Sequence, residues 1–210
     1  MRSPNEELMI KEIKDFFHAQ LNEHELILKK TKFSLEKDFI KLVNICVESI
    51  KKKKKIIFFG NGGSASDSQH LATELTVRFS KNRKAIPALS LVTDTSTISA
   101  IANDFGFKYL FSRQIEAIGE KGDVAIGIST SGKSPNVIEG LKSAKKKNIK
   151  CVIFTGKNSV GFRKNCDCVI SIPAKNTSRI QEMHITIGQM LCNAIEYKLR
   201  LAPLVNEETK

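Results

Sequence analysis

A glycine-rich run, GNGGS at residues 60–64, follows a short apolar segment and precedes a helical pattern. Such a turn leaves backbone N–H groups free at the positive end of a helix dipole, and these two features together bind anions. The run lacks the Gly-Lys-Ser/Thr ending of a P-loop, so hydrolysis of a nucleoside triphosphate is not expected. It fits the dinucleotide pattern G-x-G-x-x-A, but no acidic residue lies about 20 residues further on at the end of a second strand. The run therefore predicts an anion site of another kind.

A second loop, STSGKSPN at residues 129–136, indicates which anion binds. Its hydroxyl groups belong to Ser129, Thr130, Ser131 and Ser134. Hydroxyls and backbone amides can surround one phosphate without any lysine. The alternative is a plain helix N-cap, which Ser134 followed by Pro135 would satisfy alone. So many hydroxyls in one short loop favour a phosphate site.

His70 and Glu74 are four residues apart in the expected helix, so both side chains project from one face. Metal sites use this spacing, although a lone pair of this kind is more often a hydrogen-bonded surface pair. A later helical segment places polar groups in an otherwise apolar pattern, namely Gln181, Glu182, His184 and Gln189. Together these residues favour a metal-binding or catalytic site.

The elements that position these residues follow from the apolar pattern. Short apolar runs predict buried parallel strands at 56–59, 86–92, 123–129, 151–155 and 168–172. Helices are expected between them at 64–80, 95–119 with a break near Gly106, 135–147, 159–165 and 178–200. Two amphipathic helices, 5–29 and 34–52, precede the sheet. We expect a single α/β domain over residues 1–210, a three-layer sandwich with N-terminal helices at 1–52 and an α/β core at 53–200.

Composition narrows the class of protein. The 210 residues are 41% hydrophobic and 27% charged, as in an ordinary soluble domain, and no apolar run approaches the about 20 residues of a membrane span. The N-terminus lacks the features of a signal peptide, so we expect a cytoplasmic location and five reduced cysteines buried as core residues. The net charge of +12 suits a phosphate-bearing substrate. Nucleic acid is not expected, because no aromatic residues interleave the lysine clusters.

Four motifs occur in order along the chain, at residues 60–79, 91–107, 122–137 and 179–196. Together they resemble the bacterial phosphoheptose isomerases, which have the sugar isomerase (SIS) fold. The resemblance implies a five-stranded parallel sheet flanked by helices, and a homotetramer with active sites between subunits. It also implies a Zn²⁺ cofactor and the conversion of D-sedoheptulose 7-phosphate to D-glycero-D-manno-heptose 7-phosphate. This reaction begins heptose synthesis for surface polysaccharides such as lipopolysaccharide.

The resemblance also assigns roles by position. It implies substrate contacts at Asn61, Gly62, Gly63, Ser64, Glu74, Asn103, Asp104 and Gln181. It implies phosphate contacts at Ser129, Thr130, Ser131 and Ser134. The implied zinc ligands are His70, Glu74 and Gln181, with Gln189 at the position where the family has a histidine. A glutamine amide can ligate through its oxygen, but it does not exchange protons near neutral pH.

Isomerisation of a ketose to an aldose needs a base and an electrophile that stabilises the enediolate. Glu74 is the predicted base and Zn²⁺ the predicted electrophile. The proton donor stays open between His184, a bound water and a substrate hydroxyl. One alternative is a non-catalytic regulator of the same fold that binds the replication initiator DnaA, but that regulator lacks a glutamate at the position of Glu74. Another is a sugar-phosphate-sensing SIS module, which has no need of the pair formed by His70 and Glu74.

Overall fold

The computed structural model describes residues 4–157 and 161–202. The strands are β1 (Ile56–Gly60), β2 (Ala88–Ser90), β3 (Val124–Ser129), β4 (Lys150–Thr155) and β5 (Cys168–Ser171). The helices before and around β1 are α1 (Pro4–Ser34), α2 (Glu36–Lys51) and α3 (Gly63–Thr76). The later helices are α4 (Thr95–Asp104), the short 3₁₀ turn η1 (Phe107–Tyr109), α5 (Leu110–Ile118), α6 (Pro135–Lys146) and α7 (Thr177–Lys198). None of the helices in these ranges is both long and apolar enough to cross a membrane.

The strands form one five-stranded sheet in the order β2-β1-β3-β4-β5, and every neighbouring pair is parallel. The predicted parallel sheet is therefore confirmed. After β1 the chain runs to β2 on one side and then returns to β3 on the other. Connections that leave β1 and β3 toward opposite faces open a crevice at the carboxyl ends of these strands, where ligands of such sheets bind. The glycine-rich run and the hydroxyl loop both lie at this end.

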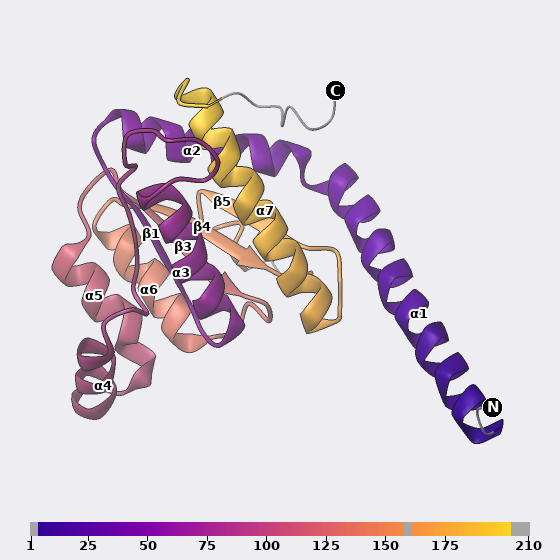
Figure 1. Cartoon of the computed structure of the whole chain (residues 1–210). Helices are drawn as coiled ribbons and strands as arrows, with labels where there is room; N and C mark the ends of the chain where they lie inside the picture. The colour runs from indigo at the N-terminus through magenta and orange to yellow at the C-terminus, as the bar shows by residue number, and fades with distance from the viewer. Residues whose placement is uncertain (1–3, 158–160, 203–210) are drawn as a thin grey trace.

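The sheet separates two layers of helices, as Figure 1 shows. Ile56 and Phe58 of β1 face a core shared with α2, α3 and α7. Ile57 and Phe59, the alternate residues, face a second core shared with α5 and α6. Side chains of a strand point alternately to its two faces, so near-continuous apolar strands are what a sheet covered on both sides requires.

Helix α1 extends away from the three-layer body in Figure 1. Several of its large apolar side chains are exposed, among them Leu8, Ile13, Phe16, Phe17 and Leu21. Helix α2, in contrast, packs its buried face against the sheet and α7. The two predicted N-terminal helices thus have different surroundings within one chain.

Some predicted boundaries are wrong. The helix expected at 159–165 falls partly outside the described residues, and residues 161–165 form a turn in which Asn165 and Cys166 both donate to the carbonyl of Phe162. The strand expected at 86–92 shortens to β2, because the N–H of Ile86 donates to the carbonyl of Leu75 in α3 rather than to a neighbouring strand. The break near Gly106 is confirmed, since α4 ends at Asp104.

Candidate active site

The centre of the site is the exposed face of α3 beside α7. Nε2 of His70 lies 2.8 Å from Oε1 of Glu74, and their side chains are 48% and 20% exposed. The amide nitrogen of Gln189, on α7, lies 3.2 Å from the same ring nitrogen. The structure therefore brings three of the four predicted metal ligands together.

These three groups do not form a self-consistent hydrogen-bond network. A single ring nitrogen of His70 is faced by a carboxylate oxygen, which needs a donor, and by an amide nitrogen, which needs an acceptor. One nitrogen of a neutral imidazole can serve one of these neighbours. A cation would instead accept lone pairs from the imidazole nitrogen and the carboxylate. It would also accept a lone pair from the amide oxygen of Gln189 if that amide rotated to exchange the positions of its oxygen and nitrogen. Imidazole and carboxylate ligands suit a divalent metal ion, so the donor set fits one.

Gln181, the remaining predicted ligand, contacts a different part of α3. Its amide lies directly over Gly63, where a Cβ atom would collide with it. Gly63 begins α3 about two turns before His70, since each turn holds about 3.6 residues. Among the described residues, no group of three or more His, Cys, Asp or Glu side chains is placed to hold a metal ion. A complete metal shell here therefore depends on the glutamines.

The glycine-rich run and the hydroxyl loop are joined by a pair of amides. Nδ2 of Asn61 donates to Oδ1 of Asn136 at 2.9 Å, and Nδ2 of Asn136 donates back at 2.8 Å. Asn136 is 2% exposed and follows Pro135 at the start of α6. Sequence reasoning missed Asn136, because its partner is 75 residues away. The reciprocal bonds fix the spacing of the two predicted anion-binding loops.

The side chain of Ser134, in the hydroxyl loop, does not cap its helix. Ser134 is the N-cap of α6, yet its side chain makes no capping bond. Its Oγ lies 2.9 Å from Oγ of Ser129 instead. A plain N-cap would accept a hydrogen bond from the first turn of the helix. The two hydroxyls are therefore paired with each other rather than with the backbone of the helix.

A cavity of about 390 Å³ opens beside this loop and is lined by Thr130 and Ser131. Its lining includes three exposed lysines, Lys133, Lys157 and Lys175. None of these three forms an ion pair with any residue in the described ranges. Unpaired positive charge around hydroxyls attracts an anion.

Comparisons with known proteins agree with this arrangement. The SIS domain family matches residues 21–156. A phosphoheptose isomerase of Paramagnetospirillum magneticum is 49% identical over 181 residues, which are 86% of this chain and 94% of that protein. Phosphoheptose isomerase 1 of Campylobacter jejuni is 49% identical over 83% of this chain and 93% of its own length.

The chain belongs to the phosphoheptose isomerase family of SIS-domain proteins.

A solved structure supports the same assignment. The phosphoheptose isomerase of Neisseria gonorrhoeae superimposes with a TM-score of 0.82 at 34% identity, over 88% of this chain and 99% of that one. The predicted SIS fold is thereby confirmed.

Three further residues predicted for the site have hydrogen-bond partners other than His70. His184 is 0% exposed, with its ring against Phe154 and its Nε2 3.3 Å from the carbonyl of Thr155. Burial lowers the pKa of His184 to about 4, so its imidazole is neutral at physiological pH. Asn103 and Asp104 are exposed at the end of α4, and Nδ2 of Asn103 donates to Oδ1 of Asp104 at 2.8 Å.

Asp67 is a buried acid on α3, close to His70, that sequence reasoning missed. It lies one turn before His70 on α3 and is 9% exposed. Burial raises the pKa of Asp67 to about 6, although nearby His70 opposes the shift. Its Oδ2 has no hydrogen-bond partner among the described residues. An acid three residues before a histidine is the signal that could have pointed to it.

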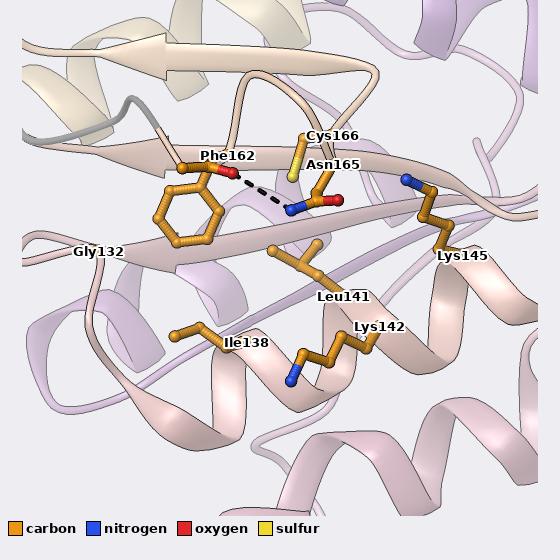
Figure 2. A pocket seen from close by; sticks show the side chains of 9 residues that line it. Gly132, Ile138, Leu141, Lys142, Lys145, Phe162, Asn165 and Cys166 are labelled. Carbon is orange, nitrogen blue, oxygen red and sulfur yellow. Dashed lines mark hydrogen bonds between the residues drawn. The ribbon is translucent and has the colours of Figure 1, made fainter.

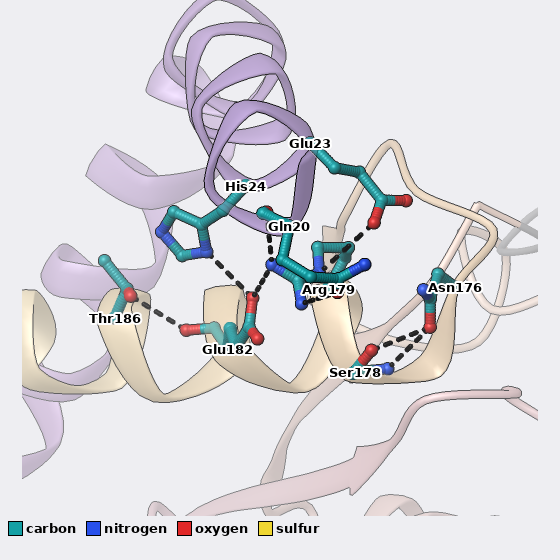
Figure 3. A network of polar contacts seen from close by, with 8 residues as sticks. All are labelled: Gln20, Glu23, His24, Asn176, Ser178, Arg179, Glu182 and Thr186. Atoms are coloured by element: carbon teal, nitrogen blue, oxygen red, sulfur yellow. Dashed lines mark hydrogen bonds and ion pairs between the residues drawn. The ribbon is translucent and has the colours of Figure 1, made fainter. Parts of the chain in front are cut away.

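The start of α7 is held by a network that includes α1, shown in Figure 3. Arg179 donates from Nη1 to the carbonyl of Gln20 at 3.1 Å and lies 3.1 Å from Oε2 of Glu182. Nδ1 of His24 lies 2.8 Å from the same Glu182 oxygen. Gln181 is thus anchored between two residues that bind α1.

Another cavity, of about 410 Å³, lies between α6 and the turn at 161–166 (Figure 2). Its walls are largely apolar, with Ile138, Leu141 and Phe162. Burial raises the pKa of Cys166 there to about 11, so its thiol is not a ready nucleophile. None of the predicted isomerase site residues lines this cavity.

Proposed function

We propose that this chain is a ketose–aldose isomerase that converts D-sedoheptulose 7-phosphate to D-glycero-D-manno-heptose 7-phosphate, the first step of heptose synthesis for surface polysaccharide. Its membership of the phosphoheptose isomerase family supports this substrate. The observation that carries the proposal is the partly exposed carboxylate of Glu74, 2.8 Å from His70. A protein that only senses a sugar phosphate does not need a base at this place.

The names of the relatives favour an enzyme over a regulator. The proteins from Paramagnetospirillum magneticum and Campylobacter jejuni, each 49% identical to this chain, are both named isomerases. The DnaA-binding regulator, in contrast, lacks a glutamate at the position of Glu74.

Glu74 is the base of the proposed reaction. It takes the proton from C1 of the open-chain ketose, a double bond forms between C1 and C2, and O2 takes up a proton. The enediol then loses its O1 proton, the C1 carbonyl forms, and C2 receives a proton from Glu74. A bound water or a substrate hydroxyl carries the proton between O1 and O2, because the imidazole of His184 is enclosed.

Zn²⁺ is the proposed cofactor, with His70, Glu74, Gln181 and Gln189 as its ligands. The convergence of His70, Glu74 and Gln189 supports this assignment. When bound, the ion would supply positive charge that stabilises the enediolate oxygens.

The substrate phosphate binds the hydroxyls of Ser129, Thr130, Ser131 and Ser134 in this proposal. The pairing of Ser129 with Ser134 and the cavity beside Thr130 and Ser131 support it. The three lysines of the cavity, Lys133, Lys157 and Lys175, raise the local concentration of the anionic sugar.

The proposed enzyme is a cytoplasmic homotetramer with active sites at subunit interfaces. Exposed apolar residues on α1 support an oligomer. So does an apolar cavity of about 570 Å³ between α1, α2 and α7, whose lining includes Phe39, Met183 and Met190. In such a tetramer, Asn103 and Asp104 of one subunit would contact the substrate bound to another subunit.

The proposal is tested by incubating the zinc-loaded protein with sedoheptulose 7-phosphate and following formation of the aldose phosphate. Wild type should turn over, and Glu74→Gln should lose activity by about 10²-fold or more, since general-base catalysis contributes about 10²–10⁴-fold. Glu48→Gln makes the same chemical change on the exposed face of α2 and should keep full activity. A folded wild type that binds the sugar phosphate without turnover would contradict the proposal.

A further inference from the structure

An ion pair lies enclosed between α7 and the segment that follows α3. Nε of Arg83 is 2.6 Å from Oε1 of Glu196, and the two side chains are 1% and 0% exposed. Arg83 comes seven residues after α3 ends, and Glu196 lies in the last turns of α7. Neither residue belongs to the predicted site.

The guanidinium of Arg83 also binds the C-terminal end of α3. Its Nη2 donates to the carbonyl of Glu74 at 2.7 Å, and its Nη1 donates to the carbonyl of Leu75 at 2.7 Å. The last carbonyls of a helix have no partner within the helix, so a cation placed there satisfies them. One of the two carbonyls belongs to Glu74, the proposed base.

The carboxylate of Glu196 ties the same end of α3 to α7. Its Oε1 accepts both from Arg83 and from the N–H of Phe79, the latter at 3.0 Å. Seven residues before Glu196 on the same helix is Gln189, whose amide faces His70. The pair therefore connects the two helices that together form the site.

We propose that Arg83 and Glu196 are positioning residues that set the register of α3 against α7 and thereby place Glu74 and Gln189 for the isomerase reaction. The inference rests on the proposed function. A buried ion pair often adds little stability over apolar side chains of similar volume, so the fold alone does not explain its presence. Its links to the backbone of the base and to the helix of Gln189 do explain it.

A matched pair of isosteric variants tests the proposal. Glu196→Gln removes the charge of the positioning pair. Asp123→Asn removes an equally enclosed carboxylate in the turn just before β3. Oδ2 of Asp123 lies 2.7 Å from Nζ of Lys55, and the hydrogen bonds of this carboxylate are to Lys55 and Glu120 rather than to α3 or α7. Both should lower the melting temperature.

Glu196→Gln should also lower kcat by about tenfold or more with KM within about twofold, because small misplacements of catalytic groups can cost about 10²-fold. Asp123→Asn should keep kcat within about twofold of wild type.

A double variant separates positioning from folding. Arg83→Met with Glu196→Leu replaces the buried pair by apolar side chains and leaves no unpaired buried charge, so the protein should fold and melt at a higher temperature than Glu196→Gln. It leaves the carbonyls of Glu74 and Leu75 without the guanidinium, so kcat should stay about tenfold or more below wild type. A kcat restored together with the melting temperature would show that the pair is merely structural and would overturn the proposal. Equal losses of kcat in Glu196→Gln and Asp123→Asn would do the same.

Zn²⁺ affinity, measured by competition with a chelator, distinguishes failure of this inference from failure of the proposed function. Glu196→Gln should bind Zn²⁺ about tenfold or more weakly than wild type, and Asp123→Asn should not differ. If the wild type binds Zn²⁺ without isomerising the sugar, and Glu196→Gln binds Zn²⁺ more weakly, the proposed function is wrong and the positioning role stands. If the wild type is active, and Glu196→Gln has the same kcat and Zn²⁺ affinity as the wild type, the proposed function stands and the positioning role is wrong.

Discussion

Several of the predicted site residues do not change their protonation state near neutral pH. The amides of Gln181 and Gln189 do not titrate there. The enclosed His184 stays neutral because burial lowers its pKa to about 4. Asp67 differs, because burial raises its pKa to about 6, within the range in which an enzyme works. Of these residues, Asp67 is the one whose shifted pKa lies close to neutral pH.

Asp67→Asn is expected to stabilise the protein at pH 7.5 and not at pH 4. The folded-state pKa of about 6 lies above the ordinary 3.8, so between these values the folded chain keeps a proton that the unfolded chain has lost. Stability falls as pH rises through this window, and the neutral asparagine avoids that loss. Urea unfolding should show a gain of about 1–2 kcal/mol at pH 7.5 that shrinks toward zero at pH 4.

Asp15→Asn, on the exposed face of α1, serves as the control for this pH dependence. It should leave the free energy of unfolding unchanged at both pH values. An Asp67→Asn protein that is less stable than wild type at pH 7.5 would show that the charged carboxylate is compensated in the fold.

Gln189→His is expected to raise kcat by about tenfold, since positioned acid–base groups contribute about 10²–10⁴-fold in full. An imidazole beside His70 could ligate a metal ion as the amide does and could also exchange protons. The kcat–pH profile should gain an ionisation near neutral pH. Gln189→Leu, which removes both abilities, should lower kcat, and equal kcat values in all three proteins would exclude a role for this position.

At the scale of elements, the contact between α3 and α7 determines which residue of α7 lies beside His70. Gly188 lies against Leu71, and a Cβ atom added there would come within 2.5 Å of Cδ1 of that leucine. Leu71 is fully buried, so it has little room to move aside. The next residue on α7, Gln189, is the one that faces His70. Close approach of the two helices thus brings the amide to the histidine.

Gly188→Ala should therefore push α3 and α7 apart and lower both stability and kcat. Overpacking costs about 1–3 kcal/mol, and the better helix propensity of alanine offsets up to about 1 kcal/mol of that. Gly161→Ala adds a Cβ atom where nothing lies within 4 Å and should leave both quantities unchanged. The measurements are the melting temperature and kcat of both variants and of wild type. Wild-type values of both quantities in Gly188→Ala would contradict the prediction.

At the scale of the whole molecule, α1 carries exposed apolar side chains that a single chain leaves in water. Phe16 is 62% exposed and Phe17 56% exposed. Apolar side chains gathered on one element usually mark a contact with another protein. We expect Phe16→Ser with Phe17→Ser to convert the proposed tetramer to smaller species in light scattering coupled to size exclusion. Lys14→Ser on the same helix should remain tetrameric, and a tetramer in both variants would place the interface elsewhere.

The sequence predicts those parts of the molecule that depend on local spacing. The four-residue interval between His70 and Glu74 is enough to place them together on a helix, and the apolar runs are enough to predict the parallel sheet. The bond between Asn61 and Asn136 depends on how β1 and β3 pair, which no local pattern encodes. The register of α7 against α3 likewise decides that Gln189, and not Gln181, faces His70. Burial of His184 follows from the same packing.

The order of these elements along the chain bears on how the protein becomes active during its synthesis. The site needs α7, the last described helix, whereas α3 follows the first strand of the sheet. The strands, the glycine-rich run and the hydroxyl loop are therefore synthesised before Gln189, Glu196 and the apolar residues of α7 that cover one face of the sheet. Turnover would begin only after α7 has been synthesised and has packed against α3, and a chain truncated before α7 would lack both Gln189 and part of the core.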